Sequence, residues 1–260
     1  MTLSSTKLAM TSRAIARYGI LIVFATVALY PFVWVLLSSL KDNFEVYSNA
    51  FGLPMTWKFE NWARAWSIGD FSINFFNSIL VSALSTGLVV LLSAMAAYSL
   101  ARVWPQQSLY VLMTLGIMIP IHALLIPTFV LIRGLGIMNT RLSLILVYAA
   151  TNTSLSVFIL VGFMRGIPRA LEESALIDGA SWFRIFFSII MPLSRPGLAT
   201  IGTLSFLNAW NEFVYASVLI ANPLLRTIPL GIASLRGQYF TDYGIMCAGL
   251  AIAIVPVMAL

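Results

Sequence analysis

The chain has 260 residues, of which 60% are hydrophobic and only 9% are charged, and its formal net charge is +6. A soluble domain carries roughly a quarter charged residues, so this chain has too few charges to cover a surface that faces water. The fifteen basic residues lie singly between apolar runs and form no patch or stripe, which argues against a nucleic-acid-binding protein.

Single copies of cysteine and histidine limit the chemistry of the chain. Cys247 is the only cysteine and His122 the only histidine, which excludes a disulfide within the chain, a zincin site and a two-histidine iron site. The chain also lacks the glycine-rich loop with lysine that cradles nucleotide phosphates. We therefore predict no catalytic residue, no metal site and no cofactor bound by this chain.

The first apolar stretch, residues 18–40, follows three basic residues in the manner of a signal peptide. It is about twice as long as the apolar region of a signal peptide, and no small-x-small cleavage site follows it. We interpret it as a retained membrane span.

Five further stretches are apolar and long enough to cross a bilayer, for which about 20 residues suffice. They are residues 74–100, 109–132, 142–163, 198–220 and 243–260. Backbone groups must be satisfied inside lipid, so we expect helices. The sequence thus predicts an all-α polytopic membrane protein of about six transmembrane helices. The last stretch ends without a basic or aromatic anchor, so we also expect a C-terminal tail beyond it.

The predicted organisation has two parts. Residues 1–72 would hold the N-terminus, the first transmembrane helix and an external loop, and residues 73–260 a permease core of five transmembrane helices. The basic residues divide eight to seven between the two sides, but three of them precede the first span and Lys41 follows it. Because the first span often dominates orientation, we expect a cytoplasmic N-terminus.

Residues 165–195 form the most polar loop of the chain, and they carry helix-end signals. Pro168 suits the first turn of a helix, and Glu172 and Glu173 lie near its positive N-terminal end. Gly179 suits the left-handed residue that ends a helix. The sequence predicts a short helix before Gly179.

A second short helix is predicted to follow in the same loop. Ser181 is expected to cap this helix, which continues through Phe186 and Ile190. Pro192 is expected to stop it, since proline has no backbone N–H to donate. The two helices would be joined at residues 178–180.

The loop resembles the cytoplasmic signature of binding-protein-dependent ABC importer permeases. The family pattern is Glu-Ala-Ala, three residues, Gly, nine residues, and then Ile-x-Leu-Pro. The matching residues, in register, are Glu173-Ser174-Ala175, Gly179 and Ile189-Ile190-Met191-Pro192. Serine for alanine and methionine for leucine keep size or apolarity. The match also lies between the fourth and fifth spans, as in that family.

The resemblance implies a type I ABC importer permease fold in which this loop is the coupling helix that docks into a groove of a separate ATPase subunit. The implied coupling residues are Glu172, Glu173, Ser174, Ala175, Asp178, Gly179, Ala180 and Pro192. The acidic residues among them would pair with basic groups on the partner. The implied partners are a second homologous permease, two ATPase subunits that bind ATP and Mg, and an external solute-binding protein. The alternative is an ordinary solvated loop.

Three further segments resemble carbohydrate importer permeases of the maltose-transporter type. They are Asn61-Trp62-Ala63, Phe76-Asn77-Ser78 and Asn208-Ala209-Trp210-Asn211-Glu212-Phe213. The resemblance implies import of a sugar or oligosaccharide across the cytoplasmic membrane by alternating access. It also implies that the external loop of residues 222–242 reaches into the docked binding protein. Import of a non-sugar solute by the same machinery remains an alternative.

Glu212 is the only acidic residue well inside a predicted span, and an intramembrane carboxylate is costly unless it faces a cavity or a partner. With Asn208 and Asn211 it would line a substrate pathway, or it would pack against the partner subunit. Asn152 and Ser156 belong to a polar stripe of the fourth span and would hydrogen-bond sugar hydroxyls or neighbouring helices.

Two rival functions fit the sequence less well than an importer permease. A secondary transporter would use Glu212 as a proton or cation site, but this leaves the register of the loop unexplained. An intramembrane enzyme lacks residues, since the chain has one histidine, one cysteine and no paired intramembrane acids.

Overall fold

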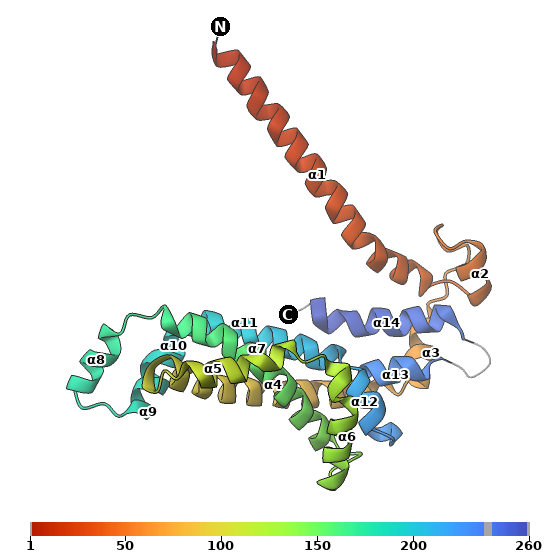
Figure 1. Cartoon of the computed structure of the whole chain (residues 1–260). Coiled ribbons are helices and arrows are strands. Elements are labelled where there is room, and N and C mark those ends of the chain that lie inside the picture. The colour runs from red at the N-terminus through yellow and green to blue at the C-terminus, as the bar shows by residue number, and fades with distance from the viewer. Residues whose placement is uncertain (1, 237–240, 259–260) are drawn as a thin grey trace. The chain divides into compact units, whose positions relative to one another are not determined.

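The computed structural model describes residues 2–236 and 241–258, with side chains from residue 17 onward. Within these ranges the elements are helical, apart from one isolated antiparallel bridge between Arg236 and Thr241 (Figure 1). The α-helices are α1 Thr2–Ser38, α2 Asn43–Ser48, α3 Glu60–Ile68, α4 Phe71–Tyr98, α5 Gln107–Leu115, α6 Leu125–Gly134, α7 Arg141–Arg165, α8 Ala170–Ile177, α9 Trp182–Ile185, α10 Met191–Leu193, α11 Arg195–Asn211, α12 Val214–Leu219, α13 Ile228–Ser234 and α14 Tyr243–Met258. Short 3-10 helices are η2 Gly116–Met118, η3 Ile121–Leu124 and η5 Pro223–Leu225, and π-helical turns are η1 Ser99–Val103 and η4 Phe186–Ile190. The predicted all-α class is confirmed.

The described helices include three that are long and apolar enough to cross a membrane unbroken, namely Arg17–Ser38, Phe71–Val103 and Arg141–Arg165. Two bent helix pairs are together long and apolar enough to be broken spans or re-entrant loops, one with a bend of 96° between Met118 and Ile121 and one with a bend of 77° after Leu193. The sixth predicted span corresponds to α14, which has 16 residues, and residues 259–260 lie outside the described part.

The predicted third span, residues 109–132, is broken rather than continuous. Pro120 cannot donate a backbone hydrogen bond, and it pushes the residue before it out of the helical region. Ile119 is accordingly extended, with φ −81° and ψ 118°. His122 is the second residue of η3, which begins the next segment after the break.

The chain divides into two compact units, each described here by itself. The first contains the elements up to Gly69 together with α14, and the second runs from Asp70 to Ala233. In this division α14 groups with the N-terminal elements. Contacts explain this: a Cβ on Gly244 would lie 2.4 Å from the Lys41 carbonyl, so α14 and that loop approach closely.

Asn61 fixes the loop of the first unit. Its side-chain amide is buried and donates to the carbonyls of Ser39, at 3.0 Å, and Lys41, at 2.8 Å. The neighbouring Trp62 indole N–H donates to Ser39 Oγ at 3.1 Å. The Asn-Trp pair that the sequence marks as a resemblance thus ties α3 to the end of α1.

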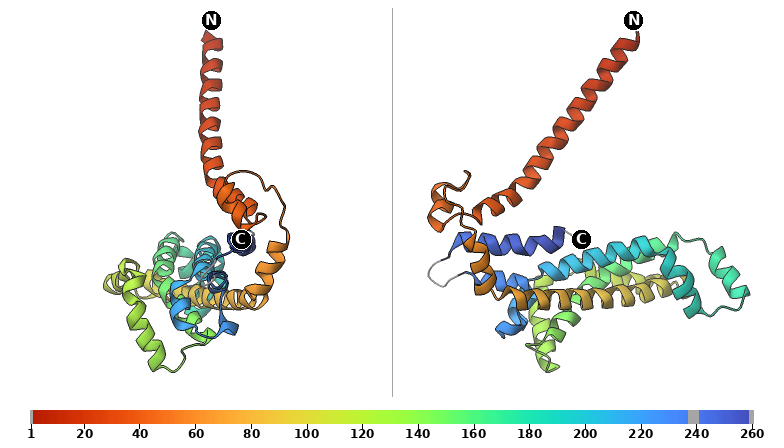
Figure 2. Two further views of the ribbon diagram at one scale, coloured as in Figure 1. Left: turned by 90° about the vertical axis from the view of Figure 1, so that its right-hand side faces the viewer. Right: turned by 180° about the vertical axis from the view of Figure 1, so that it is seen from behind.

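In the second unit, α4, α7 and α11 run side by side (Figures 1 and 2). Small residues allow this close packing, as is usual between membrane helices. Gly197 of α11 is an example, since a Cβ there would lie 2.8 Å from Cγ of Phe163. One apolar cluster, around Leu160 and Ile201, lies next to the 165–195 loop, and another lies around Tyr148 and Tyr215.

Asn77, at the start of α4, holds the segment that follows α12. Its buried side chain donates to the carbonyls of Leu224, at 3.0 Å, and Arg226, at 2.9 Å, and accepts from Arg141 Nε at 2.7 Å. The hydroxyl of Ser78 accepts from the N–H of Ile228 at 2.8 Å. The first half of the 222–242 loop is therefore fixed to α4, while residues 237–240, including Gly237, lie outside the described residues.

Replacing Asn77 with alanine is expected to destabilise the second unit by about 1–3 kcal/mol, because buried polar partners lose their hydrogen bonds. Thermal unfolding of the purified transporter complex measures this effect. Phe76→Ala, at an exposed neighbour, is the matched control. An unfolding temperature of Asn77→Ala equal to that of the control would contradict the assigned role.

Candidate functional site

The predicted coupling loop contains the helix α8, which ends at a left-handed glycine. Gly179 has φ +79°, and its N–H donates to the carbonyl of Leu176 at 3.0 Å. The N–H of Ala180 donates to the carbonyl of Ala175 at 2.9 Å. These are the 5→2 and 6→1 hydrogen bonds of a Schellman motif. The predicted helix end at Gly179 is confirmed.

Ser181 caps the next helix, as predicted, because its hydroxyl accepts from the N–H of Arg184 at 3.4 Å. Pro192 does not stop that helix, which continues through Leu193. The reason lies in η4, where the N–H of Met191 donates to Phe186, five residues back. This wider π turn lets the chain pass the proline, whose missing N–H would break a regular ladder.

Most of the implied coupling residues lie on the surface of this chain. Exposed or half-buried are Glu173, Ser174, Ala175, Asp178, Gly179, Ala180 and Pro192. Large apolar side chains lie among them, and Ile177 is 86% exposed. An exposed surface of this mixed kind suits a protein partner.

Glu172 departs from the expectation that it pairs with a partner. Its side chain is 7% exposed, and Oε1 lies 3.2 Å from Nε of Arg102, whose side chain is 4% exposed. This contact is an ion pair whose geometry falls short of a hydrogen bond. The guanidinium also donates to the carbonyls of Met164, at the end of α7, and Ile167. Glu172 therefore fastens α8 to its own subunit.

Tyr98 completes this cluster from the end of α4. Its hydroxyl donates to Glu172 Oε2 at 3.4 Å, and its ring centroid lies 5.3 Å from that of Phe186. The π turn η1 follows Tyr98, and Arg102 belongs to it. Together these contacts define the Arg102 cluster, formed by Tyr98, Arg102 and Glu172, which joins α4, α7 and α8. In the sequence Arg102 is marked only as one of the basic residues between the predicted spans.

A second feature is the break between α11 and α12 at Glu212. The residue is extended, with φ −69° and ψ 125°, so the predicted continuous fifth span is wrong at this point. Its carboxylate accepts from the N–H groups of Tyr215, at 2.8 Å, and Ala216, at 3.1 Å. It also accepts from the hydroxyl of Tyr148 at 2.7 Å. Three donors thus replace the interrupted helical bonds.

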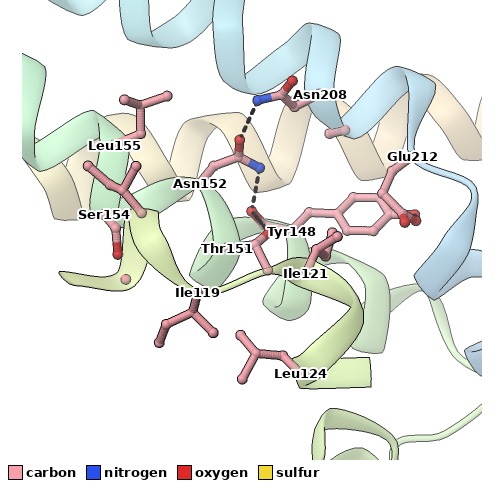
Figure 3. A pocket seen from close by; sticks show the side chains of 13 residues that line it. Ile119, Ile121, Leu124, Tyr148, Thr151, Asn152, Ser154, Leu155, Asn208 and Glu212 are labelled. Carbon is pink, nitrogen blue, oxygen red and sulfur yellow. Dashed lines mark hydrogen bonds between the residues drawn. The ribbon is translucent and has the colours of Figure 1, made fainter. Parts of the chain in front are cut away.

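The side chains near this break line a pocket of about 400 Å³. Figure 3 shows Asn152 of α7 between Asn208 of α11 and Tyr148, with Glu212 beside the Tyr148 ring. Asn208 donates to Asn152 Oδ1 at 2.9 Å, and Asn152 donates to the Tyr148 carbonyl at 2.8 Å. Isoleucine and leucine side chains, including Ile121, form the apolar wall.

The structure brings three of the five predicted pathway residues together in this pocket, namely Asn152, Asn208 and Glu212. Ser156 is buried in α7 and donates to the Asn152 carbonyl at 2.8 Å, away from the lining. Asn211 is exposed and donates to Leu207, four residues back.

Three polar lining residues were not predicted as site residues, namely Tyr148, Thr151 and Ser154. Thr151 lies in the polar stripe that the sequence shows, so its neighbours pointed to it. Tyr148 lies one helical turn before Asn152, and its link to Glu212 joins residues 64 apart in sequence. Only the four-residue spacing between Tyr148 and Asn152 indicates that their side chains share one face of the helix.

Membrane helices, a structured helical loop and a polar pocket at a helix break define a membrane transport subunit. The chain belongs to the family of binding-protein-dependent transport system inner membrane components, whose model matches residues 89–260.

Curated relatives agree with this assignment. The chain is 36% identical over 249 residues to the diacetylchitobiose uptake system permease protein NgcG of Streptomyces coelicolor, covering 94% of this chain and 82% of the relative. It is 36% identical over 242 residues to the sulfoquinovosyl glycerol transport system permease protein SmoH of Agrobacterium fabrum, covering 89% and 82%.

A solved structure has the same fold. It is a bacterial ABC transporter involved in import of the acidic polysaccharide alginate, 20% identical, with a TM-score of 0.83 over 96% of this chain and 94% of the solved chain. The protein is thus a permease subunit of a binding-protein-dependent ABC importer. It is a non-catalytic, multi-pass component of the bacterial inner membrane.

Proposed function

We propose that this subunit forms one half of the transmembrane pathway of an importer for a sugar or oligosaccharide. The pocket with Asn152, Asn208 and Glu212 carries the proposal, because amides and carboxylates pair with sugar hydroxyls. The relatives support it, since they are named for the uptake or transport of diacetylchitobiose, sulfoquinovosyl glycerol and arabinooligosaccharides. The other half would come from a second, homologous permease.

In this proposal the chemistry takes place in two ATPase subunits, which bind ATP and Mg. The exposed face of α8 would dock into an ATPase groove, with Glu173 and Asp178 facing basic groups there. The Arg102 cluster would pass the motion of α8 to α4 and α7, because it is tied to both. The N-terminus would lie in the cytoplasm, on the same side as α8, and an external binding protein would deliver the solute.

The hydrogen bonds of Glu212 disfavour the alternative function of an ion-coupled secondary transporter. Its carboxylate already accepts from two backbone N–H groups and from the Tyr148 hydroxyl. A carboxylate that closes a helix break in this way is a structural cap with one remaining acceptor position. A proton or cation site would have to disrupt the cap in every transport cycle.

Reconstitution tests the proposed function. The subunit alone in proteoliposomes is expected to hydrolyse no ATP and to import none of a panel of neutral disaccharides: maltose, cellobiose and diacetylchitobiose. The complete complex with its binding protein is expected to import at least one of them only with ATP. Uptake by the lone subunit without nucleotide would establish the secondary-transporter alternative. ATP-driven uptake of a non-sugar solute alone would limit the function to the importer class.

A further inference from the structure

The charge of the pocket distinguishes between classes of sugar. Glu212 is the only acidic residue among the thirteen lining residues, and these include no lysine, arginine or histidine within the described part of the chain. Uncharged polar groups supply the rest, from Tyr148, Thr151, Asn152, Ser154 and Asn208.

A neighbouring pocket has the same character. Its volume is about 410 Å³, and it shares Thr151 and Ser154 with the first. Its further polar side chains are those of Thr128 and Tyr215, and its described lining contains no charged residue. A solute that occupies either pocket finds no cation to pair with among the described lining residues of this chain.

Glu212 is held where its charge acts on the pocket. Its three hydrogen bonds come from neutral groups, and among the described residues Glu212 forms no ion pair that would cancel the carboxylate charge. The two oxygens together accept about four hydrogen bonds, which leaves one position for a donor from a solute. A sugar hydroxyl can donate there, but a carboxylate or sulfate group can only accept.

From this geometry we infer that the pocket selects neutral or cationic sugars and rejects anionic ones, with Glu212 as the residue that determines this specificity. The inference rests on the proposed function and deepens it. An anionic group in this pocket would be desolvated without a cation from the described residues of this chain and would face the negative charge of Glu212, and both effects are unfavourable. Neither the fold nor the family causes the rejection, because the similar solved transporter is described as importing acidic alginate, and SmoH is named for sulfoquinovosyl glycerol, which carries a sulfonate.

A protection experiment on the complete complex tests the inference without relying on the selectivity of the binding protein. Thr151→Cys places a thiol in the pocket, and Cys247 is buried, so the unmodified chain is the background control. The rate of alkylation by N-ethylmaleimide, a neutral reagent, is measured on this subunit. The probes are the imported neutral disaccharide and its uronate, in which one hydroxymethyl group is oxidised to a carboxylate.

The neutral disaccharide is expected to slow alkylation, and the uronate to need a concentration at least about tenfold higher for the same protection. In Thr151→Cys combined with Glu212→Gln, this ratio is expected to fall to near one. Asn208→Lys, which adds a cation and leaves the hydrogen bonds of Glu212 in place, is expected to lower it as well. Asn211→Asp adds a carboxylate one residue away, outside the lining, and is expected to leave the ratio within about twofold.

The outcomes separate this inference from the proposed function. If the complex imports no neutral sugar, the proposed function fails and the inference falls with it. If import occurs but both sugars protect equally, or neither protects, the pocket does not select by charge and only the inference is overturned. A ratio that Glu212→Gln and Asn208→Lys both leave unchanged would likewise overturn the role of Glu212.

Discussion

Arg102→Met is expected to abolish sugar uptake and to reduce strongly the amount of ATPase that co-purifies with this subunit. The substitution keeps an unbranched stem but removes the guanidinium, which leaves the Glu172 carboxylate buried without its cation. It also removes the donor to the carbonyls of Met164 and Ile167. Breaking a buried ion pair by removing one partner costs about 3–5 kcal/mol, a large part of the stability of a domain.

A double variant separates the effect of an unpaired buried charge from the effect of the lost link between α8 and α7. In Arg102→Met combined with Glu172→Leu both charges are absent, and replacing a buried pair by apolar groups is often close to neutral. This variant is expected to recover most of the folded subunit, while uptake stays low because the link from α8 to α7 is missing. Glu173→Gln, at the exposed neighbour, is the control for loss of a carboxylate on α8. Normal uptake by Arg102→Met would show that the Arg102 cluster transmits nothing.

The sequence predicts well those features that depend on local physics. Apolar length alone locates the unbroken spans in α1, α4 and α7, because lipid demands about 20 apolar residues in a helix. The ends of α8 follow from residues with one strong conformational preference, such as Gly179, whose φ is positive. The signature in the loop then identifies the family, which the comparison with known proteins confirms.

Features that depend on distant partners could not be predicted. Glu172 and Glu173 are adjacent and chemically alike, and only the position of Arg102, 70 residues earlier, buries the first and leaves the second exposed. A π turn also cannot be predicted from the sequence, since it follows from the packing around it and not from the preference of one residue. For this reason Pro192 appeared to end a helix that passes through it.

The helix break at Glu212 shows a different limit. A run of apolar residues on both sides predicts one span, because hydropathy measures composition and not continuity. The break is stable only because Tyr148 and two backbone N–H groups satisfy the carboxylate. The sequence correctly marked the residue as costly, and the structure shows which contacts compensate that cost.

Gly179 offers the sharpest test of the coupling loop, since its backbone conformation and its surroundings have separate effects. Its φ of +79° suits glycine, and a non-glycine residue there costs roughly 1 kcal/mol or more. Apart from the two neighbours of Gly179 in sequence, no atom of the described residues lies within 4 Å of the position of a Cβ, so a side chain would meet no obstacle there. Any further loss on substitution must come from a partner.

Gly179→Asp is therefore expected to leave the spans inserted, to weaken ATPase docking and to uncouple ATP hydrolysis from uptake. Asparagine and aspartate tolerate the left-handed region about equally and have the same shape, so Gly179→Asn controls for strain and size. Alanine tests strain alone. If backbone strain dominates, Ala is as harmful as Asp or more so, whereas a docking surface predicts the order Ala, Asn, Asp, with Asp the most harmful. Co-purification of the ATPase and ATP-driven uptake measure this order, and normal docking with normal uptake in Gly179→Asp would show that the loop is only a solvated connection.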